Sequence, residues 1–173
     1  MDAKGRREKI ADTLKASHTP ITGTELARRL HVSRQVIVGD IALLRAGGMQ
    51  IYATPAGYLL PDGGKTEGAR RVIAACHLGE EALLDELLTV TALNGVVEDV
   101  SIEHKLYGEF RATLMIRDRA GAEGFVKRMR ESGMEPMSLL TGGVHLHTIA
   151  AKDEEALNQI EEALLQKGYL LKE

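Results

Sequence analysis

The sequence predicts an α+β protein in two parts: an N-terminal domain of three helices and a β-hairpin, then a C-terminal βαββαβ domain with an extra αβ tail. A chain of 173 residues is long enough for one domain or two small ones. Helical patterns and one hairpin pattern come first, and strand and helix patterns alternate after a polar, glycine-rich stretch. We therefore expect domains at residues 1–61 and 69–173, with a linker at 62–68.

The composition is that of an ordinary globular protein, with 44% hydrophobic and 27% charged residues. Aromatic residues make up only 3%, which argues against aromatic stacking platforms for single-stranded nucleic acid. The net charge of −3 is unevenly distributed. Residues 1–60 carry nine Lys and Arg against five Asp and Glu, whereas residues 61–173 carry thirteen against twenty. This asymmetry indicates that the N-terminal part binds a polyanion.

Three features of the sequence predict a cytoplasmic protein with no membrane partner. Cys76 is the only cysteine, so the chain cannot form an intramolecular disulfide. No apolar run approaches the roughly 18 residues of a membrane span. The N-terminal residues also lack the hydrophobic region of a signal peptide.

Apolar periodicity and capping residues mark the first three helices. Residues 4–17 place apolar side chains at helical spacing among charged ones. Thr22 and Glu25 have the form of a capping box, in which the hydroxyl accepts from a free backbone N–H, so a second helix starts there. Ser33 can cap a third helix. The expected buried stripe of that helix is Val36, Ile37, Ile41 and Leu44.

Two short extended runs within residues 51–60, joined by a turn with Pro55 and Gly57, predict a small β-hairpin. Three helices and a hairpin match the winged helix-turn-helix arrangement, whose third helix enters the major groove of DNA. A protein-binding winged helix with a solvated face is the alternative, but the positive charge of this part favours DNA. The predicted DNA-binding residues are Thr24, Ser33, Arg34, Gln35, Thr54 and Tyr58.

The second part of the chain alternates strands and helices in the order βαββαβ, followed by one more helix and a short strand. This order is typical of the ferredoxin-like arrangement, an antiparallel sheet for which we expect the strand order 4-1-3-2. The fourth strand then runs antiparallel beside the first. The expected strands span residues 71–77, 96–104, 110–116, 144–150 and 169–171, and the expected helices span residues 80–93, 122–130 and 154–166.

Histidines of this second domain predict a metal site. His145 and His147 are two residues apart in a strand, so they point to the same face with Cα atoms about 6.5–7 Å apart. The expected pairing of the first and fourth strands brings His77 beside His145. Imidazoles suit Zn, Ni, Cu or Fe, and Glu86 or Asp85 on the following helix could supply a carboxylate ligand.

The alternative for these histidines is a solvent-facing or hydrogen-bonded pair, which is the commoner fate of an isolated His-x-His segment. Only the expected convergence with His77 favours a metal here. His104 ends the second strand at the same end of the sheet, but two strand spacings of about 4.8 Å separate it from the first strand. We therefore expect His104 to be a neighbour of the site and not a ligand.

Several segments resemble a known family. The sequences TGGVHLHTI at 141–149 and VSIEHKLYG at 100–108, with Cys76-His77, resemble the three-histidine (3H) domain. The sequence VSRQVIVGDI at 32–41 is similar to the helix-turn-helix that precedes this domain in niacin-responsive transcriptional repressors. The resemblance covers nearly the whole chain. It implies a homodimeric repressor that binds operator DNA, carries nickel or zinc, uses nicotinic acid as co-repressor, and shuts down genes of niacin uptake or NAD synthesis.

The resemblance also implies roles for individual residues. The metal ligands of the family map onto three histidines and one acidic residue of this chain: His77, His145, His147 and Glu86. Asp85 and Glu81 stay open as alternatives for the acidic ligand, because the loop after the first histidine is one residue longer than the family pattern. His104 and Tyr107 match a further histidine segment, which implies that they line the nicotinic acid pocket.

Two other functions fit the same residues. A metal-sensing regulator would respond to the ion alone, without an organic effector. A small metalloenzyme with a DNA-binding appendage is the other, since an open three-histidine site can activate water. Because no second acid–base group is visibly paired with the cluster, we expect a regulator and not an enzyme.

Overall fold

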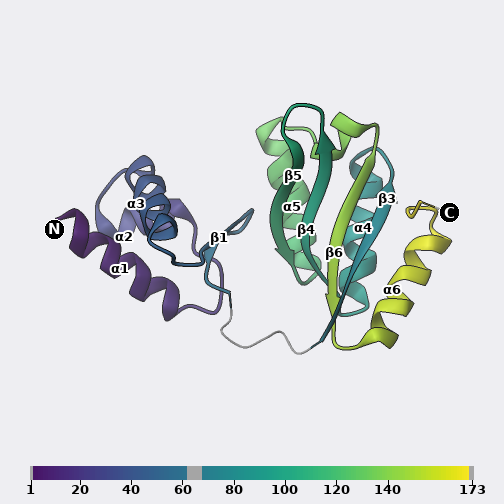
Figure 1. The fold of residues 1–173 in the computed structure, drawn as a ribbon, viewed down its shortest axis with the longest axis horizontal. Helices are drawn as coiled ribbons and strands as arrows, with labels where there is room; N and C mark the ends of the chain where they lie inside the picture. Colours follow the sequence, from purple (N-terminus) through teal and green to yellow (C-terminus); the bar gives the residue numbers. More distant parts are fainter. Residues whose placement is uncertain (1, 62–67, 172–173) are drawn as a thin grey trace. The chain divides into compact units, whose positions relative to one another are not determined.

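The computed structural model describes residues 2–61 and 68–171 (Figure 1). The chain divides into two compact units, Met1–Thr66 and Glu67–Glu173. Nearly all of the expected linker, residues 62–67, lies outside the described residues. Within the described ranges, no helix is long and apolar enough to cross a membrane.

The N-terminal unit has the three helices and the hairpin that the sequence predicts. Its elements are α1 (Ala3–Lys15), α2 (Gly23–Leu30), α3 (Arg34–Ala46), β1 (Tyr52–Thr54) and β2 (Gly57–Leu59). The side chains of Thr22 and Ser33 cap α2 and α3 by accepting backbone N–H groups at the first turn of each helix. The elements enclose an aliphatic core that includes Ile10, Leu14, Leu26, Ile37 and Ile41.

One residue of the expected stripe on α3 is not buried. Val36 is exposed, whereas Ile37, Asp40 and Ile41 face the core. Neighbouring residues on a helix point about 100° apart. The buried face of α3 is narrow, so it contains Ile37, Asp40 and Ile41 but not Val36. The stripe therefore includes a carboxylate that the sequence pattern did not predict.

Asp40 links α3 to α1 through a partly buried ion pair. Its side chain is only 4% exposed and accepts from Nε of Arg6 at 2.5 Å, and Nη1 of Arg7 lies 3.6 Å away. A buried carboxylate is costly unless charged donors compensate its lost hydration. The two arginines of α1 thus compensate the charge of Asp40 inside the small unit.

We expect Arg6→Met to lower the free energy of unfolding of the N-terminal unit by about 1–3 kcal/mol, because it leaves Asp40 without its closest donor. Lys15→Met is the matched control, since the Lys15–Asp12 pair is exposed and should contribute less than about 1 kcal/mol. Denaturant unfolding followed by circular dichroism measures both. Equal losses in the two variants would contradict the role given to Asp40.

The C-terminal unit has the expected chain order. Its elements are β3 (Ala69–Cys76), α4 (Glu80–Ala92), β4 (Val96–His104), β5 (Gly108–Ile116), α5 (Arg119–Ser132), η1 (Met137–Thr141), β6 (Val144–Ala151) and α6 (Glu154–Gln166). The helices α4, α5 and α6 lie on one face of the sheet (Figure 1). The short 3-10 helix η1 was not expected. The predicted tail strand at 169–171 is reduced to one antiparallel bridge between Leu170 and Ala75.

The order of strands in the sheet differs from the expectation. The sheet is antiparallel with the order β3-β6-β4-β5, which is 1-4-2-3 and not 4-1-3-2. The residue types agree with this order only in part. β6 carries no Asp, Glu, Lys or Arg, which suits a strand flanked on both sides, but the other interior strand, β4, carries Glu98, Asp99 and Glu103. The first and fourth strands are neighbours in both orders, so His145 still lies opposite Ala75 near the end of β3.

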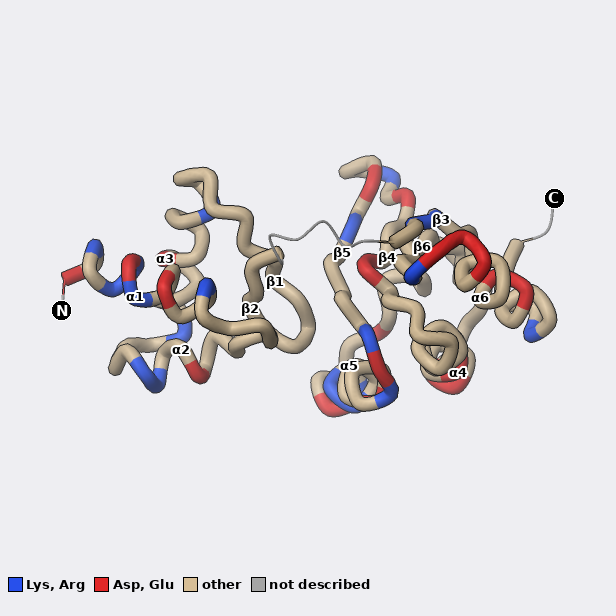
Figure 2. Tube along the Cα trace, turned by 90° about the horizontal axis from the view of Figure 1, so that it is seen from below, with Lys and Arg blue, Asp and Glu red and all other residues tan. Residues whose placement is uncertain are grey.

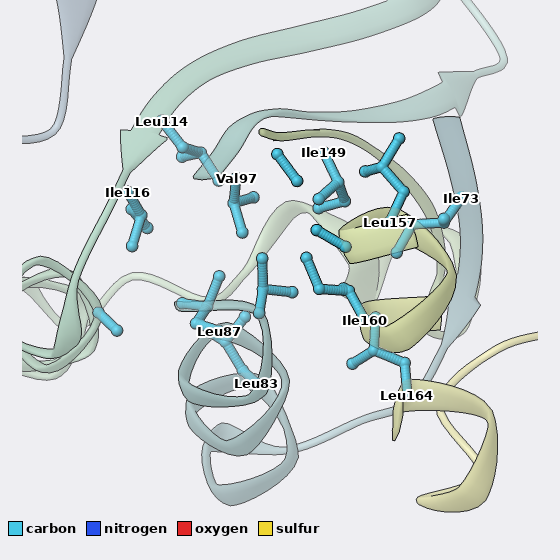
Figure 3. Close-up of a cluster of buried hydrophobic side chains, with 14 of the residues drawn as sticks. Ile73, Leu83, Leu87, Val97, Leu114, Ile116, Ile149, Leu157, Ile160 and Leu164 are labelled. Atoms are coloured by element: carbon cyan, nitrogen blue, oxygen red, sulfur yellow. The ribbon is translucent and has the colours of Figure 1, made fainter. Parts of the chain in front are cut away.

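The core of this unit lies between the sheet and the helices. Ile73 and Ile149 of the sheet face Leu87 of α4 and Leu157 of α6 (Figure 3). Burying an aliphatic side chain of this size stabilises a fold by roughly 1.5–3 kcal/mol. At the end where β6 begins, η1 contacts β4 and β6. The histidines predicted from the sequence lie at this end.

Candidate metal centre

Three imidazoles converge on a single carboxylate oxygen. The Nε2 atoms of His77, His145 and His147 lie 2.6, 3.3 and 3.4 Å from Oε2 of Glu86, respectively. Glu86 is completely buried, and His145 and His147 are almost completely buried. The structure therefore brings together all four residues that the sequence singled out as metal ligands.

The local sequence explains how each side chain reaches the cluster. In β6, the alternation of the strand places His145 and His147 on the helix-covered face together with Ile149. In α4, Glu86 stands in the buried stripe between Leu83 and Val90 and therefore points at the sheet. His77 follows the last residue of β3, next to the start of β6.

Hydrogen bonds orient the two histidines of β6. Nδ1 of His145 donates to the carbonyl of Gly143 at 2.8 Å, and Nδ1 of His147 donates to the carbonyl of Asp99 at 2.6 Å. A neutral imidazole that donates from Nδ1 presents a lone pair at Nε2, which is the form that binds metals. Backbone acceptors behind the outer ring nitrogen are typical of metal-ligating histidines.

The donor set fits a metal ion. Oε1 of Glu86 and Nε2 of His147 are buried, and neither forms a hydrogen bond with any residue that the structure describes. Neutral imidazole nitrogens and a carboxylate are all acceptors, so a cation among them would satisfy groups that otherwise repel one another. One ligand atom from each of His77, Glu86 and His145 lies within 4.8 Å of the others. Nε2 of His147 is not in this closest group but lies 3.4 Å from the same carboxylate, and the cluster is compatible with metal binding.

The electrostatics of the cluster favour positive charge. Burial by itself would raise the pKa of Glu86, but the close approach of His145, His147 and His77 outweighs burial and holds that pKa well below its usual range. Burial would lower the pKa of His147, but Glu86 outweighs burial and raises it. Both shifts follow from the same close contact between a buried carboxylate and imidazoles.

The two alternatives for the acidic ligand lie elsewhere. The carboxylate of Asp85 accepts from Nζ of Lys167 at 2.8 Å and from the hydroxyl of Tyr169 at 2.7 Å. Burial and Asp85 raise the pKa of Tyr169 to about 12, so this hydroxyl remains a donor at neutral pH. Glu81 is exposed at the start of α4. The geometry therefore favours Glu86 over Asp85 and Glu81.

The two residues expected to line an effector pocket belong to a cluster of rings at the β4–β5 turn. The ring of His104 lies 5.3 Å from those of Tyr107 and Phe110, measured between centroids. Tyr107 is 68% exposed. Nδ1 of His104 accepts from the backbone N–H groups of Leu106 and Tyr107. The described contacts of His104 and Tyr107 thus stabilise the turn.

A cavity of about 260 Å³ adjoins the histidine cluster. It lies between the start of α4, the end of α5 and η1, and it opens beside His77. The ion pair between Arg130 and Glu80 lines it. Glu135 and the hydroxyl of Ser138 also line it, and the apolar part of the wall comes from Leu83, Met129, Met134, Pro136 and Leu139.

The predicted DNA-contacting residues lie on the helix-turn-helix and the hairpin. Thr24, Arg34 and Gln35 are exposed, as is Ser33, whose oxygen accepts from the N–H of Val36. Tyr58 is half-buried and packs against the core of the N-terminal unit. Lys and Arg are frequent along α1 and α2 (Figure 2). The start of α3 is thus open to a partner.

The sequence analysis missed the residues that support the ligands. Gly143 supplies the acceptor for His145, and its φ of +100° and its close approach to His77 require glycine. The glycine pair before the His-x-His segment could have indicated such a close approach. The roles of Asp99 and Tyr169 could not be predicted from the sequence. Asp99 acts through its backbone carbonyl, and Tyr169 contacts a ring that is distant in sequence, so neither role produces a local sequence pattern.

A helix-turn-helix domain joined to a domain with a buried three-histidine and glutamate cluster defines a two-domain transcription regulator. The chain belongs to the NiaR/NadR family of 3H-domain proteins. Residues 70–173 match the family model of the 3H domain, and residues 6–59 match that of an HTH domain.

Two relatives cover most of the chain. The "Probable transcription repressor NiaR" of Thermotoga maritima is 45% identical over 168 residues, which span 97% of this chain and 94% of that protein. The "Transcription repressor NadR" of Bacillus subtilis is 40% identical over 170 residues, with the same coverage. These names and the HTH match indicate a regulator and not an enzyme.

Proposed function

We propose that this chain is a DNA-binding transcription repressor whose C-terminal domain binds nickel or zinc and uses nicotinic acid as its co-repressor. The observation that carries the metal site is the approach of three Nε2 atoms to within 3.4 Å of one buried oxygen of Glu86. The repressor function is supported by the names of both relatives. Nicotinic acid is supported by the resemblance to niacin-responsive repressors.

In this proposal, His77, His145, His147 and Glu86 hold the ion. The bound ion supplies a coordination position for the carboxylate or the pyridine nitrogen of nicotinic acid. Gly143 and Asp99 keep the rings of His145 and His147 oriented through their carbonyls. Because all four ligands come from the C-terminal unit, no residue of the DNA-binding unit is needed to form the site.

Nicotinic acid needs a space beside the ion for its ring. The cavity next to His77 has a volume of about 260 Å³ and a wall of both apolar and charged side chains, and we propose that it receives the ring of nicotinic acid. His104 and Tyr107 are the residues that the resemblance implies for this role. The cavity is the stronger candidate, because a proposed metal ligand lines it directly.

On the DNA side, Ser33, Arg34 and Gln35 at the start of α3 would meet base edges and phosphates in the major groove. Thr24, Thr54 and Tyr58 would contact the backbone. A homodimer would match two half-sites one or more DNA turns of about 34–36 Å apart. In a dimer, the two DNA-binding units must be placed so that both reach their half-sites. Nicotinic acid would promote repression only by binding more tightly to the dimer in that arrangement. Such a cytoplasmic repressor would control genes of niacin uptake or NAD synthesis.

We expect His145→Ala to abolish the effect of nicotinic acid on operator binding, while weak and salt-sensitive DNA binding persists. The residual binding comes from Lys and Arg of the N-terminal unit and falls steeply with salt. Band-shift titrations of metal-loaded protein with and without nicotinic acid measure both effects. His18→Ala, a substitution of an exposed histidine, is the control that should keep the response. A full response in His145→Ala would refute the proposed site.

Calorimetry separates the proposal from a metal-sensing regulator. Protein loaded with nickel or zinc is titrated with nicotinic acid, and the proposal expects saturable binding that metal-free protein lacks. Metal-dependent DNA binding without any heat from nicotinic acid would instead favour a regulator that senses the ion itself.

A further inference from the structure

The chain returns to the metal centre after α6. The N–H of Cys76 donates to the carbonyl of Tyr169 at 2.8 Å, and the N–H of Leu171 donates to the carbonyl of Ala74 at 3.0 Å. Residues 167–171, the C-terminal segment, therefore lie along the outer edge of β3. This is the end of β3 that directly precedes His77.

Tyr169 of this segment connects β3, α4 and His77. Its ring packs against that of His77 with 5.1 Å between centroids and an angle of 62° between planes. Its hydroxyl donates to Oδ2 of Asp85 at 2.7 Å, and Nζ of Lys167 contacts both oxygens of Asp85 at 2.8 Å. The ring is therefore fixed at its hydroxyl end while its side contacts the imidazole.

His77 differs from the other two histidines in how its ring is held. His145 and His147 each donate from Nδ1 to a backbone carbonyl, but within residues 2–61 and 68–171 Nδ1 of His77 forms no hydrogen bond. His77 also lies beyond the last residue of β3, two residues before Gly79 with its φ of +91°. The contacts on its ring are those with His145 and Tyr169 and the approach of Nε2 to Glu86.

We propose that Tyr169 is a positioning residue for the metal ligand His77, and that the C-terminal segment is therefore part of the metal centre. The ring of Tyr169 does for His77 what the carbonyls of Gly143 and Asp99 do for the other two histidines: it limits the orientations in which Nε2 can point at the ion. Asp85 and Lys167 act one step further out by fixing Tyr169. This inference rests on the proposed metal site and adds to it a segment that follows the last helix.

The test compares Tyr169→Leu and Tyr169→Phe with the wild-type full-length protein. Ni²⁺ release to an excess of a chromophoric chelator should be about 10- to 100-fold faster in Tyr169→Leu, the range seen when a partner behind a metal ligand is lost. Tyr169→Phe keeps the ring contact and should stay within a few-fold of wild type. Phe110→Leu removes an exposed aromatic ring of the same domain and is the matched control.

A spectroscopic readout separates positioning from general stability. The visible absorption of Co²⁺ reports the number and geometry of its ligands. It should change in Tyr169→Leu, be restored in Tyr169→Phe and be unchanged in Phe110→Leu. If Tyr169→Leu does not fold, Asp85→Asn and Lys167→Met loosen the same ring without removing it. Each should then speed Ni²⁺ release several-fold.

The outcomes distinguish this inference from the proposed function. If wild type binds Ni²⁺ and Co²⁺ but Tyr169→Leu matches it in release rate and spectrum, Tyr169 has no positioning role and the metal site stands. If Phe110→Leu accelerates release as much as Tyr169→Leu, the effect is not specific and the inference also fails. If wild type binds neither ion, the inference and the proposed metal site are both overturned.

Discussion

Glu86→Gln is expected to remove tight metal binding while leaving the fold intact. Glutamine has the size and shape of glutamate, so the buried stripe of α4 stays filled. The change removes the negative charge of the carboxylate on which the three Nε2 atoms converge. Loss of a residue that hydrogen-bonds to a metal ligand typically lowers metal affinity by about 10- to 100-fold. The affinity of Glu86→Gln for Ni²⁺ or Zn²⁺ should fall further, because the ligand itself is lost. Native mass spectrometry reports metal occupancy and oligomeric state together.

Glu81→Gln provides the control for this variant. It makes the same chemical change on the same helix, at an exposed position that the sequence left open as a ligand. Metal occupancy should match wild type in Glu81→Gln and be lost in Glu86→Gln. The reverse result would mean that α4 rearranges on metal binding and that the geometry described here is not that of the ligand set.

The four candidate ligands could be predicted because their convergence depends on only one feature of the sheet. The sequence analysis expected the wrong strand order, yet the first and fourth strands are antiparallel neighbours in both orders. The wrong order followed from analogy with the usual ferredoxin-like sheet. The charge pattern alone could not correct it. The uncharged β6 suits an interior position, but the interior strand β4 carries Glu98, Asp99 and Glu103 and so is as charged as the edge strand β3.

The choice between Glu86 and Asp85 was also present in the sequence. Leu83, Leu87 and Val90 define the buried stripe of α4. Glu86 lies beside that stripe and is buried, whereas Asp85 lies about 100° further around the helix from Glu86. For α3, the predicted buried stripe was too wide. It included Val36, which is exposed, and left out Asp40, which is buried. Helical stripes are most informative where a polar residue occupies a position that must be buried.

The rest of the site could not be predicted for a different reason. The acceptor for His147 is the backbone carbonyl of Asp99, and any residue type supplies a carbonyl. The contact between Tyr169 and His77 joins residues that lie far apart in the sequence, and it depends on where α6 ends. The periodicity of apolar residues predicts helices, strands and their buried faces. Contacts such as those of Asp99 and Tyr169 depend instead on where the ends of these helices and strands lie in space.

Gly143→Ala is expected to destabilise the C-terminal unit strongly and to weaken metal binding. A Cβ at this position would lie 2.6 Å from the carbonyl oxygen of His77 and 3.1 Å from its carbon, and the φ of +100° disfavours any L side chain. Both clashes involve backbone, so relief requires β3 and β6 to move apart at the metal centre. The combined strain and overpacking should lower the free energy of unfolding by about 3 kcal/mol or more.

Gly142→Ala separates the close approach from backbone strain alone. Gly142 also has a positive φ, +64°, but a Cβ there would meet nothing within 4 Å, so its cost should be only the roughly 1–2 kcal/mol of a left-handed alanine. Denaturant unfolding of the metal-free variants gives both values, and Ni²⁺ release from the loaded variants gives the effect on the site. A larger loss in Gly143→Ala would locate the cost at the contact with His77. Equal losses of stability in the two variants would mean that β3 and β6 separate easily beside His77. The metal centre, whose histidines lie directly after β3 and in β6, would then not be preformed.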